Sequence, residues 1–433
     1  MVLLWIFTVL VLIPMAVLVA ECLAALLPRR RPTIDPAAPR PTCAVLIPAH
    51  NEEMGIGATL KSLLPQLRPK DRVLVVADNC EDRTAEVARA HGATVIERSH
   101  KTNKGKGFAL DCGVRELEKD PPEVVVIVDA DCIVHPCSLD ALVRDAGRGR
   151  PVQAAYVLNE PPDASSKQRL SAFAFKFKNV VRPLGLARLG APCLLTGSGM
   201  AFPWQVIRDA PLASGNIVED MALGLDLAVA GHPPRLCPQA EVTSELPSSK
   251  EAAAKQRRRW EHGHLRTMLT QVPRLFVAGI VRCRPRLLGL ALELSVPPLS
   301  LLFLVWAMVL AAAGAAWHWY DISLPFLVLA CGGLAVLLAI FAAWARFGRE
   351  RLPLTALLAA PFYVLWKIPI YLKFVGSPET NWVRTGRKGE APAEPAPSEP
   401  APARQEPPPP DAAACSTERG RLEPPNEKPT QQS

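Results

Sequence analysis

The stretch VVVIVDAD, residues 124–131, decides how the chain is organised. Its apolar, mostly β-branched first residues predict a strand buried on both faces, as in the middle of a parallel sheet. Asp129 and Asp131 follow at the carboxyl end of this strand, where open α/β sheets bind their ligands. A stiffly held aspartate pair suits a hard divalent cation shared with phosphate oxygens. The alternative is a polar strand end whose aspartate caps the next turn, and the rest of the chain must decide between them.

Further predicted strands precede this stretch, and each is followed by a helical or polar segment. They cover residues 43–48, 72–77 and 93–97, and the intervening helical patterns end near residues 67, 91 and 118. A basic, glycine-bearing loop is predicted at 101–107. Strands that alternate with helices predict a parallel, doubly wound sheet with right-handed crossovers.

The segment 152–245 is less regular. Residues 193–202 (CLLTGSGMAF) predict a strand interrupted by a Gly-Ser-Gly turn. A helix begins near 217–221 with acidic residues, as the helix dipole favours. The other predicted elements are a strand near 154–158, a helix over about 165–182, a strand near 235–236, and a helix that carries residues 256–260.

Three apolar stretches predict membrane spans. Residues 2–27 are long enough to cross a bilayer and are followed at once by three arginines, which places the following chain in the cytoplasm under the positive-inside rule. A cleaved signal peptide is disfavoured because no basic segment precedes the run. Residues 299–317 and 324–345 predict a hairpin of two further spans. Residues 354–374 are interrupted by Pro361, Lys367 and Pro369, so an interfacial or re-entrant helix is preferred to a full span.

Composition narrows the class of protein. Hydrophobic residues make up 49% of the 433 residues, and the net charge of +8 arises from basic clusters beside the apolar runs. Juxtamembrane clusters explain this charge better than a nucleic-acid surface, because no basic stripe is interleaved with aromatic residues. The eleven cysteines form no CxxC pair, which fits a reducing compartment.

These patterns predict a linear organisation of the chain, with a soluble domain between membrane segments. The predicted parts are a transmembrane helix at 1–27, a linker at 28–41, a cytoplasmic catalytic domain at 42–265, interfacial helices at 266–298, a transmembrane hairpin at 299–345, an interfacial or re-entrant helix at 354–375, and a disordered Pro/Ala/Glu-rich tail at 387–433.

Polar residues follow the strands in a recurring order: Asp78, then Lys104 and Lys106, then Asp129 and Asp131, then Glu219-Asp220, with Gln256, Arg259 and Trp260 downstream. In this order they resemble the membrane-bound family 2 glycosyltransferases of the cellulose, chitin and hyaluronan synthase-like type, over residues 42 to about 375. The resemblance implies an α/β fold of the GT-A type, a doubly wound, mostly parallel sheet domain flanked by transmembrane helices.

The resemblance also implies roles for single residues. Asp78 matches the aspartate that contacts the nucleotide base, and Asp129-Ala130-Asp131 matches the metal-binding Asp-X-Asp. Val218-Glu219-Asp220 matches the Thr/Ser-Glu-Asp motif of the catalytic base, departing from it at the first position. Gln256, Arg259 and Trp260 match Gln-X-X-Arg-Trp of the processive members. Glu52 ends the first strand, where the family contacts nucleotide.

Elementary chemistry suits these residues to transfer from a nucleotide-sugar. Mg²⁺ or Mn²⁺ held by Asp131, with Asp129 close to it and to the ribose, would neutralise the charge that grows on a diphosphate leaving group. Lys104 and Lys106 could add positive charge there, unless they form only a solvated loop. Asp220 is the predicted general base, with Glu219 beside it, unless Asp220 only caps its helix. A single base opposite a metal-assisted leaving group implies inversion at the anomeric carbon.

Acceptor binding is predicted downstream. Gln256, Arg259 and Trp260 share one helix face, where an indole can stack on a sugar ring, although a plain interfacial helix would show the same pattern. The Gly197-Ser198 turn could let the backbone approach an acceptor sugar, or could be only a tight structural turn.

The sequence therefore predicts a metal-dependent hexosyltransferase of the plasma membrane, multi-pass, with a cytoplasmic catalytic domain. Its expected partners are a nucleotide-sugar, the lipid bilayer, and a growing polysaccharide or lipid-linked glycan as acceptor, with no nucleic acid. Transfer of a single sugar to a lipid or short glycan is the alternative reaction, and a catalytically silent membrane scaffold is the non-enzymatic alternative. Whether an export or accessory subunit completes a channel is left open.

Overall fold

The computed structural model describes residues 1–28, 39–161, 163–213, 218–246 and 250–376. The chain divides into a unit over Met1–Glu390 and a second unit over Ala391–Ser433. All the elements given below belong to the first unit. The predicted tail at 387–433 lies outside the described residues, as does most of the predicted linker at 28–41.

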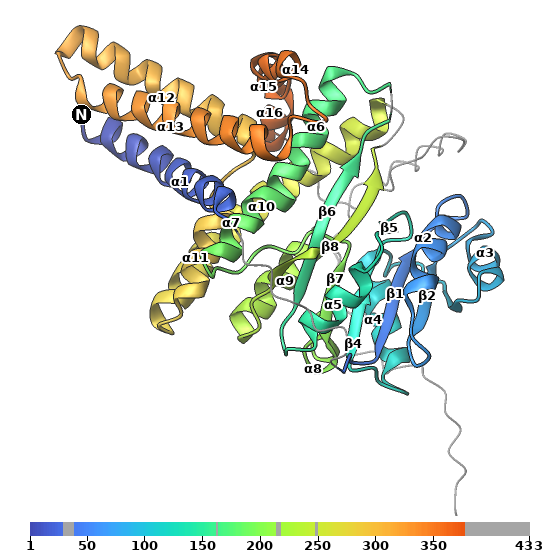
Figure 1. Ribbon diagram of the computed structural model, residues 1–433. Helices are drawn as coiled ribbons and strands as arrows, with labels where there is room; N and C mark the ends of the chain where they lie inside the picture. The colour runs from blue at the N-terminus through green and yellow to red at the C-terminus, as the bar shows by residue number, and fades with distance from the viewer. Residues whose placement is uncertain (29–38, 162, 214–217, 247–249, 377–433) are drawn as a thin grey trace, which may run out of the picture. The chain divides into compact units, whose positions relative to one another are not determined.

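One mixed sheet forms the centre of the soluble part (Figure 1), and its strand order among the described residues is β3-β2-β1-β4-β7-β6-β8-β5. Strands β1 to β4 are mutually parallel, whereas β7 runs antiparallel to both β4 and β6. The strands are β1 Cys43–Ala49, β2 Arg72–Asp78, β3 Thr94–Arg98, β4 Val124–Ile127, β5 Ile133–Val134, β6 Val152–Asn159, β7 Met200–Pro203 and β8 Arg235–Glu245.

Strand β4 is central because its side chains build two cores. Val124 and Val126 pack into the core on one face, and Val125 and Ile127 pack into the core on the other, all fully buried. The predicted strand buried on both faces is therefore present. Fully burying such a side chain contributes about 1.5–3 kcal/mol, so this short strand anchors both layers.

Helices cover both faces of the sheet, as in a doubly wound fold. The first core is completed by α2 Ile56–Leu63, α3 Thr84–Ala90 and α5 Ser138–Ala146. The second is completed by α4 Lys106–Leu117, α8 Trp204–Arg208 and α9 Glu219–Ala230. A short 3₁₀ helix, η1 Leu64–Gln66, ends the α2 segment, in agreement with the predicted end near residue 67.

Several local predictions need correction. The loop predicted at 101–107 ends earlier, because Lys106 already begins α4. Of the strand predicted at 193–202, only the part from residue 200 is a strand, because Gly197 and Gly199 adopt positive φ angles of 95° and 69° and turn the chain. The strand predicted near 235–236 extends to residue 245. The helix predicted at 165–182 consists of α6 Ser166–Lys176, a π-helical turn η2 Phe177–Val181 and α7 Arg182–Arg188.

Among the residues that the structure describes, three helices are long and apolar enough to cross a membrane: α1 Val2–Leu26, α12 Leu299–Tyr320 and α13 Leu324–Phe347. They run side by side in Figure 1, and they share one apolar cluster in which Met15 and Leu18 of α1 meet Leu329 and Val336 of α13. These helices coincide closely with the three predicted spans.

The remaining helices connect the sheet to this bundle. Helix α10 Lys250–Val281 continues without a break across the predicted domain boundary at residue 265, and α11 Pro285–Leu294 follows. The segment predicted as one interfacial or re-entrant helix is divided into α14 Leu354–Leu358, α15 Ala360–Trp366 and α16 Ile368–Gly376. Proline ends regular helical hydrogen bonding, which explains the divisions at Pro361 and Pro369. The domain boundaries themselves stay predictions.

Candidate active site

The aspartates that follow β4 lie in a tight turn at the carboxyl end of the strand. Val128 still donates its N–H to Leu46 of β1 at 3.2 Å, and the chain then leaves the sheet. The N–H of Asp129 donates to the Ser198 hydroxyl at 3.1 Å, and the N–H of Cys132 donates back to the Asp129 carbonyl at 3.1 Å. The turn therefore fixes Asp129 directly beside the Gly197-Ser198 turn.

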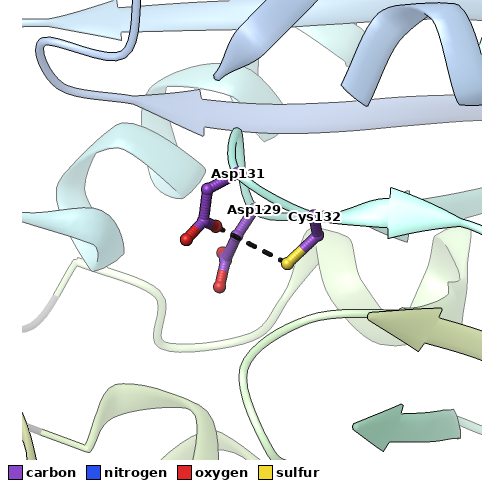
Figure 2. A group of neighbouring side chains, drawn as sticks. All are labelled: Asp129, Asp131 and Cys132. Carbon is purple, nitrogen blue, oxygen red and sulfur yellow. Dashed lines mark hydrogen bonds between the residues drawn. The ribbon is translucent and has the colours of Figure 1, made fainter. Parts of the chain in front are cut away.

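A group of three side chains in this turn could hold a metal ion: Asp129, Asp131 and Cys132, with ligand atoms within 4.8 Å of one another (Figure 2). The Cys132 thiol donates to Asp131 Oδ1 at 3.5 Å, and burial together with both aspartates holds its pKa well above the ordinary value. A protonated thiol is a poor ligand for a hard cation, whereas carboxylates are good ones. The donor set thus fits Mg²⁺ or Mn²⁺ on the two aspartates, with Cys132 as their hydrogen-bonding neighbour.

Lys106 lies at the centre of the acidic residues. Its ammonium Nζ is 2.6 Å from Asp129 Oδ1, 2.6 Å from the Gly197 carbonyl and 3.7 Å from Glu219 Oε1. Burial opposes the charged form, but Asp129, Glu219 and Asp220 outweigh it and hold the pKa of Lys106 above its ordinary value. Because the Lys106 side chain is only 16% exposed, these ion pairs are little screened by solvent.

Glu219 and Asp220 form the first turn of α9, where the helix dipole favours negative charge. A Cβ built on Gly197 would lie 3.2 Å from Asp220 Oδ2, which places the Asp220 carboxylate against the glycine turn. Burial raises the pKa of Glu219 to about 7, against the opposing effect of Lys106. The structure therefore brings Lys106, Asp129, Gly197, Glu219 and Asp220 together.

The Gly197-Ser198 turn is held from behind by Gln153 of β6. The Gln153 amide donates to the Ser198 carbonyl at 2.8 Å and accepts from the Thr196 N–H at 2.9 Å. Sequence reasoning missed Gln153, although a glutamine within the apolar run VQAAYVL was a usable signal. It also missed Ser244, whose hydroxyl donates to Asp131 Oδ2 at 3.2 Å.

Asp78 ends β2 and is 4% exposed. Arg98 donates to Asp78 Oδ1 at 2.5 Å, the Asn79 amide donates to the same oxygen at 2.9 Å, and the Gly105 N–H donates to Oδ2 at 3.4 Å. Arg98, which sequence reasoning missed, and Gly105 thus join Asp78 to the turn that precedes Lys106. No pattern of residue types marked Arg98 in advance.

Lys104 and Glu52 are among the predicted residues that lie outside the cluster around Lys106. The Lys104 side chain is exposed on the loop before α4. Glu52 follows β1, and its backbone N–H donates to the Thr84 hydroxyl at 2.7 Å. Within the part of the chain that the structure describes, the ion pairs of the central cluster come from Lys106 rather than Lys104.

Helix α10 carries Gln256, Arg259 and Trp260, all half-buried. The Trp260 ring packs against Phe175 at 5.4 Å between centroids, and Phe175 meets the edge of Tyr156 at 5.3 Å. The Tyr156 hydroxyl lies 3.9 Å from Cys132 Sγ, so an aromatic chain leads from Trp260 to the aspartate turn. Burial lowers the pKa of Arg259 despite the attraction of Glu219, Asp220 and Asp129.

Comparison with known proteins gives the class to which this mixed α/β sheet with an acidic carboxyl edge belongs. Residues 39–263 match the model of the family described as glycosyltransferase like family 2. The match covers more than half of the chain, so the protein belongs to this family. The predicted GT-A-like α/β fold is confirmed, whereas the synthase-like subtype is not.

Two curated relatives show the extent of the similarity. The probable glycosyltransferase YdaM of Bacillus subtilis is 27% identical over 255 residues, 54% of this chain and 58% of its own length. The 4,4'-diaponeurosporenoate glycosyltransferase of Staphylococcus aureus is 36% identical over 100 residues, 19% of this chain and 26% of its own length. The chain thus spans less than two thirds of either relative.

Two solved structures are similar at low identity. One is the mannosyltransferase PcManGT from Pyrobaculum calidifontis in complex with GDP-Man and Mn²⁺, with a TM-score of 0.47, 22% identity, and coverage of 83% of this chain and 99% of that chain. The other is glucosyl-3-phosphoglycerate synthase from Mycobacterium tuberculosis in complex with Mg²⁺ and UDP, with a TM-score of 0.34, 22% identity, and coverage of 52% and 79%.

Proposed function

We propose that the protein is a membrane-embedded, metal-dependent, inverting hexosyltransferase that uses a nucleotide-sugar, with UDP as the expected nucleotide. The observation that carries this proposal is the cluster of Asp129, Glu219 and Asp220 around Lys106 at the carboxyl edge of the sheet. A catalytically silent scaffold would not need several acidic groups held together at such an edge, because each buried charge costs desolvation energy.

The donor side of the site is formed by Asp129 and Asp131, which would hold Mg²⁺ or Mn²⁺. When bound, the cation neutralises the charge on the diphosphate leaving group. Asp129 is also proposed to contact the ribose side of the nucleotide. Asp78, Glu52 and Lys104 stay proposed nucleotide contacts, with Arg98 added as the partner that orients Asp78.

Asp220 is the proposed general base. Its carboxylate lies against Gly197, where the absence of a side chain lets an acceptor hydroxyl approach. Asp220 would take the proton of that hydroxyl as it attacks the anomeric carbon from the face opposite the leaving group, so the configuration inverts. General-base catalysis of this kind contributes roughly 10²–10⁴-fold. Glu219, next to Asp220, is paired with Lys106, so that the negative charge of Glu219 would be offset by the ammonium.

The acceptor side is proposed to comprise Gly197, Ser198, Gln256, Arg259 and Trp260. The aromatic contacts of Trp260 support this assignment, because they orient its indole on the path to the aspartate turn. A polysaccharide or lipid-linked glycan is the proposed acceptor, reached at the cytoplasmic face of the plasma membrane. The candidate spans α1, α12 and α13 support the membrane location.

The direct test substitutes Asp220→Asn in the full chain and measures turnover by release of nucleoside diphosphate from a panel of nucleotide-sugars. Loss of the base should lower turnover by at least about 10²-fold while the affinity for the donor stays near wild type. Asp226→Asn is the matched control, because Asp226 lies on the same helix in an exposed pair with Arg274. Unchanged turnover of the Asp220→Asn variant would refute the assignment of the base.

The length of the product separates the two enzymatic alternatives. Membranes that contain the protein are incubated with the labelled donor, and the product is sized. Long chains would support polysaccharide extension, and a product with one added sugar would establish single transfer. Absence of turnover with every donor would favour the silent scaffold.

A further inference from the structure

Lys106 contacts both sides of the candidate active site. On the donor side its ammonium lies 2.6 Å from Asp129 Oδ1. On the acceptor side it donates to the Gly197 carbonyl at 2.6 Å and lies 3.7 Å from Glu219 Oε1. This one side chain therefore links a proposed metal ligand to the turn that faces Asp220.

The Lys106 ammonium also lies on Asp129 where a bound metal ion would supply positive charge. A lysine ammonium has three donors and no acceptor, so it serves a carboxylate as a compact positive charge. A divalent ion on Asp129 and Asp131 would lie a few ångströms from this charge in a partly buried site, where repulsion is strong. The contact of Lys106 with Asp129 and the binding of a metal to Asp129 thus oppose each other.

We propose that Lys106 is an internal counter-cation that competes with the divalent ion for Asp129, so that a nucleoside diphosphate is needed to draw Lys106 away. The inference rests on the proposed function and adds an order of binding to it. The diphosphate supplies negative oxygens as new partners for the ammonium. Gly197 and Glu219 then lose their cation, and the acceptor side opens only after the donor is bound.

The test measures Mn²⁺ binding to the purified full chain by the electron paramagnetic resonance signal of free Mn²⁺, without turnover. Wild type should bind Mn²⁺ alone weakly, and about tenfold or more tightly when UDP or GDP is present. Lys106→Gln should bind Mn²⁺ alone about tenfold more tightly than wild type, because one nearby positive charge is removed. The nucleotide should then enhance Mn²⁺ binding less than in wild type.

Lys119→Gln is the matched control. It removes the same charge from an exposed side chain just beyond the end of α4, where Lys119 pairs with Glu116, so Mn²⁺ binding without nucleotide should equal that of wild type. A Lys106→Gln variant in the Asp129→Asn background should show no gain, because the contested ligand is gone.

Equal or weaker binding of Mn²⁺ alone by Lys106→Gln would overturn the proposal. If that variant fails to fold, wild type alone decides: binding of Mn²⁺ that is equally tight with and without nucleotide overturns it. Failure of the proposed function is distinguishable, because it is an absence of donor turnover, which this titration does not use.

Discussion

Gln153 shows how one buried side chain can organise an active site without touching a reactant. It is 1% exposed and bonds both to the Thr196 N–H and to the Ser198 carbonyl. Ser198 in turn accepts from the N–H of Asp129. The relative position of the glycine turn and the turn that carries Asp129 therefore depends on a side-chain amide in β6.

Replacement of this amide should uncouple the two turns. Gln153→Leu leaves two buried backbone groups without their partner, each at a cost of about 1–3 kcal/mol. We expect a fall in kcat of at least about tenfold and a lower melting temperature, with the affinity for nucleotide less affected. Steady-state kinetics and thermal unfolding in detergent check this. Gln239→Leu, a half-buried glutamine of β8, serves as the control; equal losses in both variants would contradict the assignment.

The residues that sequence reasoning found and missed differ in a physical way. Asp129, Asp131, Glu219 and Asp220 follow directly from strand ends and a helix start, which local patterns predict. Arg98, Gln153 and Ser244 serve through contacts between distant segments, and no local pattern encodes such contacts. Lys106 was found, but its pairing with Glu219 depends on how α4 and α9 face each other.

At the scale of elements, helices α1 and α7 are joined by a buried ion pair. Arg182 Nε donates to Glu21 at 2.5 Å, and the two side chains are 7% and 1% exposed. Arg182 also donates to the Glu293 carbonyl of α11 at 3.0 Å, so one guanidinium joins three helices. A Cβ on Gly185 would lie 2.0 Å from the Glu21 carbonyl, which shows how closely α7 approaches α1.

Breaking this pair should be costly, and replacing both partners should be less so. Arg182→Met leaves the Glu21 charge buried without its partner, at a cost of roughly 3–5 kcal/mol, whereas Arg182→Met with Glu21→Leu should recover much of the loss. Thermal unfolding of the detergent-purified chain measures both. Arg208→Met removes an exposed pair with Asp209 and should leave the stability close to that of wild type. A double variant no more stable than Arg182→Met would contradict this account.

Glu293 gives α11 a pH-dependent effect on stability. It is 3% exposed, and burial raises its pKa to about 8, against the opposing effect of Arg182. The folded state raises the pKa of this carboxyl group, so the folded state favours the protonated acid. The contribution of Glu293 to the stability of the fold is therefore fully present below the pKa of the unfolded state, near 4.5, and is lost as pH rises toward 8.

Glu293→Gln should remove this loss, because the amide resembles the protonated acid. We expect the variant to be more stable than wild type at pH 8.5 and close to wild type at pH 5. The difference in the free energy of unfolding should be at most about 5 kcal/mol, because each unit of pKa shift corresponds to roughly 1.4 kcal/mol. Melting temperatures across this pH range measure the difference, and Glu241→Gln, on the exposed surface of β8, is the control. Parallel profiles of melting temperature against pH for wild type and Glu293→Gln would contradict the prediction.

Element lengths show where sequence patterns succeed. The spans α12 and α13 and the strand β4 are uniformly apolar, so their bounds were predicted within a few residues. Strand β8 carries polar side chains such as Gln239 and Glu241 along its course, which hid its length. The π-helical turn η2 depends on packing against α1 and α13 rather than on residue type.

At the scale of the whole molecule, the proposed topology places the sheet in the cytoplasm. Cys137 and Cys283 are exposed in the soluble part, whereas Cys331 lies in the middle of the candidate span α13. The natural cysteines can therefore distinguish the aqueous side of the membrane from the bilayer without any engineered substitution.

A membrane-impermeant maleimide should therefore label Cys137 and Cys283 in inverted vesicles but not in intact cells. Cys331 should stay unlabelled in both because the bilayer covers it, and should react after solubilisation in detergent. Peptide mapping by mass spectrometry identifies the labelled sites. Labelling of Cys137 on intact cells would reverse the proposed orientation.

The antiparallel strand β7 restricts where insertions and deletions can be tolerated during evolution. It pairs with β4 in the register Met200 to Ile127, one step beyond the bond from the Gly199 N–H to the Ile127 carbonyl. Gain or loss of one residue between Ser198 and Met200 would turn every following side chain to the opposite face. Insertions and deletions should accordingly be rare from residue 197 to 203 and should accumulate outside this strand. Related chains of very different length can therefore share the same candidate active site.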